Sequence, residues 1–359
     1  MQKEIVIGLI GSIITAAIIS LLDYLEVFDF FDKPIPFWVL ILVFVIFLIF
    51  TLAWISIFKK KLSVNKRIFI ISSAFTSTSF FSELIKEIIQ SIESQGYEPV
   101  IKLPIEDFNI IEMNKHVDKL YNDIDSYSAG IFIHAEPDKH HERFRNFSNK
   151  FNKPLVFLDC HKNDLYKSFD DKCSFIGYEN SITGEIASDT AIDLLKRKEI
   201  DAPKILVIAS KLQSERQHNF VACIKSKLQN SEITIDDSGE FNRKIAHRIA
   251  IENLKNKLKN NIRIWDLIFC TNDEMALGVV SAIKEINNKA LNNIIILGCD
   301  GIEEAKTIID KKNKHFINTV DQNPKLLSKV GVEILFKRIK NQSAEKEFYL
   351  VPRMYIPNY

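Results

Sequence analysis

Short apolar runs alternate with amphipathic helical stretches along the chain from Arg67 to its end. Each run is bounded by polar or turn-forming residues, which is typical of buried strands in a parallel sheet. The runs expected as strands are 67–71, 98–101, 130–133, 155–158, 205–208, 233–235, 267–269 and 294–297. Helices must cross over between parallel strands, and strands this numerous exceed one ordinary sheet. We therefore expect an α/β chain with two doubly wound parallel sheets, arranged as two lobes.

Polar side chains follow two of these strands at the point where each ends. Asn272 lies two residues after the run 268–270, and Asp300 lies three residues after the run 294–297. Side chains just past the carboxyl ends of parallel strands face the ligand crevice, so both residues are placed to hold a polar group. Each also suits a helix N-cap, Asn272 for a helix from Glu274 and Asp300 for a stretch from Ile302.

Composition and motifs exclude several classes of protein. The 47 basic and 46 acidic residues nearly cancel, so no bulk charge favours nucleic acid as a partner. Five scattered cysteines with no CxxC indicate buried reduced thiols. The sequence has no P-loop, GxGxxG, zinc motif or serine elbow. His140 and His141 are adjacent, which favours a charged surface helix over a metal site. We expect no enzyme, no catalytic residue, no cofactor and no metal.

Two uncharged apolar segments precede the α/β region. Residues 5–22 and 37–58 are each long enough to cross a bilayer as a helix. A secretory signal also fits Lys3 and the first segment. That segment is longer than an ordinary signal, however, and a second apolar segment follows it. We expect a retained transmembrane helical hairpin at 1–58 and a basic linker at 59–66.

Flanking charge predicts the orientation of the hairpin. The loop 23–33 carries four acidic residues and one basic residue, whereas five basic residues lie between 59 and 67. Basic residues near span ends stay in the cytoplasm. We therefore expect a chain in the inner membrane, with both termini and the binding domain in the cytoplasm.

Small residues recur every four positions in the first segment. Gly8, Ser12, Ala16 and Ser20 lie on one face of the expected helix, which allows close helix approach. This face either packs the hairpin on itself or joins subunits into a homo-oligomer. Nothing in the sequence decides between these two arrangements.

The segments 271–278 and 294–301, with their spacing, resemble the sugar-binding family of type I periplasmic binding proteins. The ligand domains of LacI-type repressors share this fold. The resemblance extends from Arg67 to the C-terminus. It implies a first lobe at 67–178 and 323–346 and a second lobe at 179–322 and 347–359. Ligand would lie between the lobes, and the lobes would close around it by a hinge motion.

The resemblance implies ligand-binding roles in the first lobe for aromatic and polar residues that follow strands. The segment 78–81 matches the family's Asn-Pro-Phe-Phe, with a threonine replacing the asparagine. Asp159 matches an Asp-Arg pair whose arginine is replaced by Cys160. Two phenylalanines that open a helix, and a histidine after a strand, also suit plain core positions. The first-lobe candidates are Thr78, Phe80, Phe81, His134 and Asp159.

In the second lobe the resemblance rests on a helix start, two strand ends and the segment near 322–324, where the chain would return to the first lobe. The segment 214–220 resembles the family's Arg-x-x-Gly-Phe, in which Arg216 supplies the guanidinium. A solvated charge at a helix end is the alternative for this residue. The second-lobe candidates are Arg216, Phe241, Asn272, Asp300 and Gln322. Fork-like polar groups and aromatic faces together suit the hydroxyls and C–H faces of a sugar.

Two functions fit this combination. In the first, the chain is a membrane-anchored cytoplasmic sensor of a small sugar-like ligand, and lobe closure is relayed to the hairpin. One version of this sensor is a membrane-perturbing effector, as in some prokaryotic defence systems with two-span effectors. In the second, it is a tethered extracytoplasmic receptor that delivers solute to an ABC permease. The expected partners are therefore a small sugar-like molecule, the lipid bilayer and, in the second case, the permease. A second copy of the chain, paired through the hairpin or the lobes, is a further candidate, and no nucleic acid is expected. No DNA-binding headpiece is expected where the hairpin lies.

Overall fold

The computed structural model describes residues 47–48, 51, 66–76 and 78–358. Residues 1–64 and 65–359 form two units, and each is treated by itself. Among the described residues, no helix is both long enough and apolar enough to cross a membrane. The expected spans at 5–22 and 37–58 lie outside the described residues, apart from Phe47, Leu48 and Thr51. The small-residue face at Gly8, Ser12, Ala16 and Ser20 lies outside them entirely.

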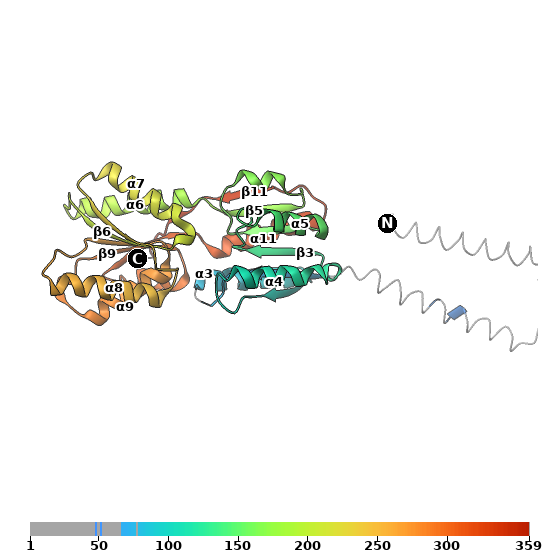
Figure 1. The fold of residues 1–359 in the computed structure, drawn as a ribbon, viewed down its shortest axis with the longest axis horizontal. Helices are drawn as coiled ribbons and strands as arrows, with labels where there is room; N and C mark the ends of the chain where they lie inside the picture. Colours follow the sequence, from blue (N-terminus) through green and yellow to red (C-terminus); the bar gives the residue numbers. More distant parts are fainter. Residues whose placement is uncertain (1–46, 49–50, 52–65, 77, 359) are drawn as a thin grey trace, which may run out of the picture. The chain divides into compact units, whose positions relative to one another are not determined.

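Six parallel strands form the sheet of the first lobe, in the order β11-β5-β4-β3-β1-β2. They are β1 (Arg67–Ser72), β2 (Glu98–Lys102), β3 (Ala129–Ile133), β4 (Leu155–Leu158), β5 (Cys173–Tyr178) and β11 (Glu347–Leu350). The helices of this lobe are α3 (Ser79–Ser94), α4 (Ile110–Tyr121), α5 (His141–Phe151) and α11 (Pro324–Ile339). Figure 1 shows these helices beside the sheet.

The second lobe repeats the pattern, with the strand order β12-β10-β9-β8-β6-β7. Its strands are β6 (Lys204–Ile208), β7 (Glu232–Asp236), β8 (Leu267–Cys270), β9 (Ile295–Asp300), β10 (Phe316–Asp321) and β12 (Arg353–Met354). Its helices are α6 (Asn180–Arg197), α7 (Ser214–Lys227), α8 (Arg243–Lys259), α9 (Asp273–Ile286) and α10 (Glu303–Asp310). Only β12 runs antiparallel to its neighbour among these paired strands.

Side-chain alternation along the strands places one core on each face of a sheet. Ile68 and Ile70 of β1 pack with α3 and α11, whereas Phe69 and Ile71 pack with α4 and α5. Successive strand residues point to opposite faces, so a strand covered on both faces is apolar throughout. This explains why 68–71 is a continuous apolar run, fully buried in the structure.

The chain passes between the lobes three times. It leaves the first sheet after Tyr178 and enters α6, then returns between Asp321 and Pro324. It passes a third time between Leu350 and Arg353. The sequence predicted that all of 347–359 belongs to the second lobe, and this prediction was wrong for the first part of that segment. Glu347–Leu350 pairs with β5 in the first sheet, and only Arg353–Met354 joins β10 in the second. Backbone pairing with the free edge of β5 decides the placement of β11, and the apolar pattern did not reveal it.

The strand order brings the carboxyl ends of both sheets to the space between the lobes. In each sheet the order reverses beside the first strand, between β1 and β3 and between β6 and β8. Ligand crevices of open α/β sheets form at such switch points. The residues that follow β3, β4, β8 and β9 therefore meet in one place.

Candidate ligand-binding site

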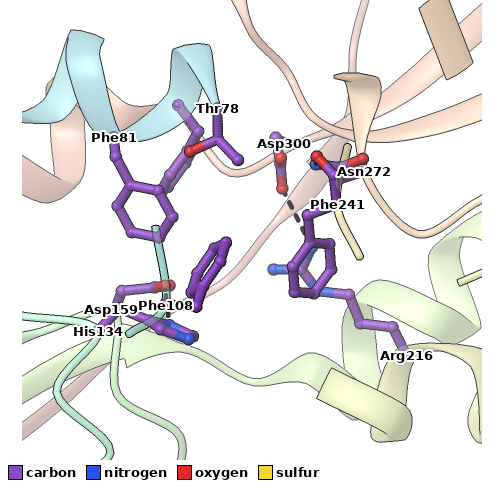
Figure 2. A pocket seen from close by; sticks show the side chains of 10 residues that line it. Thr78, Phe81, Phe108, His134, Asp159, Arg216, Phe241, Asn272 and Asp300 are labelled. Carbon is purple, nitrogen blue, oxygen red and sulfur yellow. Dashed lines mark hydrogen bonds and ion pairs between the residues drawn. The ribbon is translucent and has the colours of Figure 1, made fainter. Parts of the chain in front are cut away.

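A cleft between the two lobes collects side chains from many separate segments (Figure 2). The residues that line it are Thr78, Phe80, Phe81, Phe108, His134, Asp159, Arg216, Phe241, Asn272 and Asp300. Every predicted residue except Gln322 is among them, and Phe108 was not predicted. Whether these residues bind ligand stays a prediction, but their convergence is a property of the fold.

Arg216 is the centre of a buried polar network in the second lobe. Its Nη1 donates to Asp300 Oδ1 at 3.0 Å and to the Thr271 carbonyl at 2.9 Å, and its Nη2 donates to Gln322 Oε1 at 2.7 Å. Nε donates to Asn180 Oδ1 at 2.9 Å. Arg216 is only 3% exposed, so the alternative of a solvated charge at a helix end is wrong. Gln322 does not line the cleft itself, but it accepts a hydrogen bond from Arg216, which does.

Asp300 combines burial with a charged neighbour. Burial raises the pKa of its carboxyl to about 7, although the Arg216 guanidinium lowers it. The first residue of α10 is Glu303, and its N-cap is Ile302, so Asp300 does not cap that helix. Instead Asp273, fully buried, accepts from the Ile302 amide at 3.0 Å and from Thr319 Oγ1 at 2.6 Å. Asp273 thereby holds the turn that positions Asp300.

Asn272 caps a helix and also lines the cleft. Its Oδ1 accepts from the Met275 amide at 2.9 Å, which caps α9. Its Nδ2 donates to the Phe241 carbonyl at 3.3 Å, and the side chain lines the cleft. Asn272 therefore joins the start of α9 to the loop that carries Phe241.

The polar pair of the first lobe is His134 and Asp159. His134 Nδ1 lies 2.9 Å from Asp159 Oδ2, and His134 is 5% exposed. Because a carboxylate only accepts, Nδ1 carries the proton of this hydrogen bond; this assignment follows from the geometry. His134 Nε2 has no hydrogen-bond partner among the described residues.

Aromatic rings fill most of the space between these polar groups. Phe108 lies between the two lobes in Figure 2, with its ring centroid 6.0 Å from that of Phe81, 5.5 Å from His134 and 5.9 Å from Phe241. The remaining free volume is about 20 Å³, room for about one water. A sugar-sized ring enters only when Phe108 moves or the lobes open.

Half of the lining residues have a positive φ angle, a backbone conformation that residues other than glycine rarely adopt. Positive φ angles occur at Phe108 (64°), His134 (49°), Asp159 (59°), Phe241 (54°) and Asp300 (106°). Such conformations cost free energy and cluster at functional sites. Here each of them lies in a loop or at the end of a strand and lines the cleft.

Two carboxylates join the lobes beside the cleft. Glu274 Oε1 of the second lobe accepts from the amide and hydroxyl of Ser79 at 3.1 and 2.6 Å. Glu83 Oε1 of the first lobe accepts from the Glu303 amide at 3.1 Å. In both cases a carboxylate meets the first turn of a helix, where free backbone amides favour negative charge. The structure therefore has hydrogen bonds that stabilise the closed cleft.

The arrangement suits reversible binding of a polar ring. Arg216, Asp300, Asn272 and Asp159 can exchange fork-like hydrogen bonds with neighbouring hydroxyls, and the phenylalanines offer faces to C–H groups. The part of the chain that the structure describes contains no group of three or more His, Cys, Asp or Glu that could hold a metal.

Comparison with known proteins agrees with this geometry. The chain is 27% identical over 162 residues to the HTH-type transcriptional repressor PurR of Vibrio atlanticus, covering 40% of this chain and 46% of the repressor. Among solved structures, an ABC transporter periplasmic solute binding protein from Actinobacillus succinogenes with bound D-allose superposes with a TM-score of 0.66 at 16% identity. That match covers 80% of this chain and 96% of the other.

The Caulobacter myo-inositol binding protein, bound to myo-inositol, also gives a TM-score of 0.66 at 16% identity, covering 82% of this chain and 94% of the other. At this identity the likeness establishes the fold. The chain spans less than half the length of the repressor.

Fold and cleft together define a two-lobed α/β binding protein. The family described as "periplasmic binding protein domain" matches residues 68–343, and the chain belongs to it.

Proposed function

We propose that this chain is a membrane-anchored sensor that binds a small polar ring ligand, a sugar or a sugar-containing metabolite, between its lobes. The observation that carries the proposal is the buried cluster of Arg216, Asp300 and Gln322 opposite the aromatic rings of the cleft. Such a cluster presents paired donors and acceptors that adjacent ring hydroxyls can match. The sugars bound in the structural neighbours support the same ligand class.

Ligand binding acts on the chain by favouring one arrangement of the lobes. A ligand shifts a hinge equilibrium only if it contacts the closed state differently from the open state. Side chains from both lobes line the cleft, so a bound ring bridges His134 and Asp159 with Arg216 and Asp300. Closure is relayed to the N-terminal hairpin, whose small-residue face repacks within or between subunits.

The binding domain is placed in the cytoplasm in this proposal. Support comes from the basic residues between 59 and 67, the acidic loop 23–33 and the five cysteines that form no disulfide. Matched fusions after Tyr359, one to a reporter active only in the cytoplasm and one to a reporter active only outside, test this placement. Signal from the cytoplasmic reporter alone is expected.

A second candidate function is a tethered extracytoplasmic receptor that serves an ABC permease. The observation that favours it is that solved neighbours with this fold are ABC transporter solute binding proteins. In that case the same fusions give signal only from the exported reporter.

Ligand binding itself is tested with a panel of neutral ring polyols. The full-length chain, purified in detergent micelles, is heated with D-ribose, L-arabinose, D-allose or myo-inositol. At least one compound is expected to raise Tm in a concentration-dependent way, because ligand that binds only the folded state stabilises it. The shift should vanish in Asp300→Asn and persist in Asp189→Asn, a control at an exposed aspartate.

A further inference from the structure

A second space between the lobes is larger than the aromatic cleft. This side chamber has a volume of about 190 Å³, and its walls include His134, Asp138, Asp159, Tyr166, Lys211 and Glu215. The first four belong to the first lobe, and the last two belong to the second. His134 and Asp159 line both spaces, so the side chamber continues directly from the site of the ring.

Polar atoms in the side chamber remain available to a ligand. His134, nine-tenths or more buried, has Nδ1 engaged by Asp159 and Nε2 without a partner among the described residues. Asp138 Oδ2 lies 3.3 Å from His161 Nε2, whereas Asp138 Oδ1 is buried without a side-chain partner. A buried polar atom left unpaired costs free energy that a ligand can recover. Asp138 Oδ1 is an acceptor, and His134 Nε2 accepts in the tautomer with the proton on Nδ1, so a donor matches both atoms. The Tyr166 hydroxyl also lines the chamber without a partner among the described residues, and it can donate or accept.

The charges around the side chamber indicate the same chemistry. Four carboxylates line it, from Glu136, Asp138, Asp159 and Glu215, against the two lysines Lys139 and Lys211 and one histidine, His161. The hydrogen bond to Asp138 raises the pKa of His161. Lys139 already pairs with Glu136 at 2.6 Å. A phosphate or carboxylate on the ligand would face an excess of like charge, which is unfavourable. A neutral or cationic donor meets complementary charge.

We propose that the side chamber is a second subsite of the same ligand, which takes a nitrogen-bearing substituent. An amine or ring N–H attached to the bound ring donates hydrogen bonds to His134 Nε2 and Asp138 Oδ1. The preferred ligand is then an amino-substituted sugar or a nucleoside-like compound, in place of a plain or phosphorylated monosaccharide. This inference rests on the proposed function, because the subsite continues from the ring site.

Pairs of compounds that differ in the nitrogen-bearing group or in phosphate test the inference. The full-length chain in detergent micelles is titrated calorimetrically with D-galactose against D-galactosamine, D-ribose against adenosine, and adenosine against AMP. In at least one of the first two pairs, the nitrogen-bearing member should bind about ten-fold or more tightly than its parent. AMP should bind more weakly than adenosine.

Variants separate the subsite from the ring site. Asp138→Asn should remove the difference between members of a pair. From the other lobe, Glu215→Gln should reduce it for the cationic compound, D-galactosamine. Asp300→Asn should weaken both members, and the exposed control Asp118→Asn should behave as wild type. Sugars that bind without any preference for nitrogen, or a preference that survives in both chamber variants, would overturn the subsite alone. If no compound binds, the proposed function fails and the subsite fails with it.

Discussion

The Arg216 guanidinium and the Asp300 carboxylate form a buried ion pair that joins α7 to the end of β9. Nη1 and Oδ1 are 3.0 Å apart, and both side chains are almost inaccessible to water. Burial lowers the pKa of Arg216, but the charges of Asp300 and its neighbours outweigh burial and leave it raised. The network through Thr271, Gln322 and Asn180 satisfies the rest of the guanidinium. The cleft therefore contains a fixed donor and acceptor before any ligand arrives.

Arg216→Met tests how much this pair contributes to stability. Removing one partner of a buried pair leaves the other charge uncompensated, and the expected cost is about 3–5 kcal/mol. Urea unfolding, followed by far-UV circular dichroism, measures the change. The exposed pair of Lys227 and Asp189 provides the control, because Lys227→Ala should leave unfolding close to wild type. Equal effects of the two substitutions would contradict the burial argument.

The raised pKa of Asp300 predicts a specific pH dependence. Its pKa is about 7 in the folded chain against an ordinary value of 3.8, so the folded state binds the proton more tightly than the unfolded state. This contribution is fully present below pH 3.8 and is lost as pH rises through about 7. Between pH 4.5 and 7.5, wild type should lose more stability than Asp300→Asn. Parallel stability curves for the two proteins would refute the assignment to Asp300.

The hydrogen bonds of Ser79 to Glu274 join the two lobes, so we expect that removing one of them weakens the contact between the lobes. Ser79→Ala removes the hydroxyl that lies 2.6 Å from Glu274 Oε1, and a bond to a charged acceptor contributes about 1.5–3 kcal/mol. The starts of α3 and α9 should then exchange amide hydrogen about ten-fold faster or more. Ser82→Ala is the matched control, because the bond that Ser82 Oγ donates among the described residues stays within its own helix, to the Ser79 carbonyl. Identical exchange in both variants would show that this contact does not hold the lobes.

The Phe108 ring fills part of the cleft, but the backbone that carries it is strained. Its ring contacts Phe81, His134 and Phe241, and its φ of 64° is strained. Phe108→Gly removes the ring and relieves the backbone, since glycine adopts positive φ without penalty. It should therefore cost less stability than Phe81→Ala, for which a buried phenylalanine predicts about 3–5 kcal/mol. Urea unfolding of the two variants compares the costs directly.

Gly301 illustrates a position where close packing excludes a side chain. Its φ is 68°, and an added Cβ would meet the Asp321 side chain and backbone. Gly301→Ala should therefore lower Tm and disturb the adjacent Asp300. The measurements are a melting curve and the Asp300-dependent pH profile; a wild-type result in both would show that the turn relaxes freely.

Much of the fold follows from the sequence, because buried parallel strands are continuous apolar runs. The run 68–71 and the run 205–208 both lie within observed strands. The same criterion misses strands in which a polar residue interrupts the apolar run. β5 contains Ser174, which bonds to the Glu345 carbonyl, and β10 contains Thr319, which bonds to Asp273. Their pairing depends on tertiary partners that local pattern does not show.

The site was predictable where a polar residue ends a strand, as with His134, Asp159 and Asp300. Phe108 lies in a loop several residues after β2, and no sequence signal marks it. Its place depends on the Phe108 amide bonding to the Ser73 carbonyl at 2.6 Å and on the strand order that puts β2 beside β1. Knowledge of that order is the only signal that could have directed attention to this loop.

The proposed function requires above all that a polar ring binds in the cleft between the lobes. The direct measurement is isothermal titration of the full-length chain in detergent micelles with the polyol that gives the largest Tm shift. We expect one site per chain, with affinity lowered about 100-fold or more in Asp300→Asn and Arg216→Met and unchanged in Asp189→Asn. Binding that is indifferent to Asp300 and Arg216, or no binding by any polyol, would contradict the proposed function.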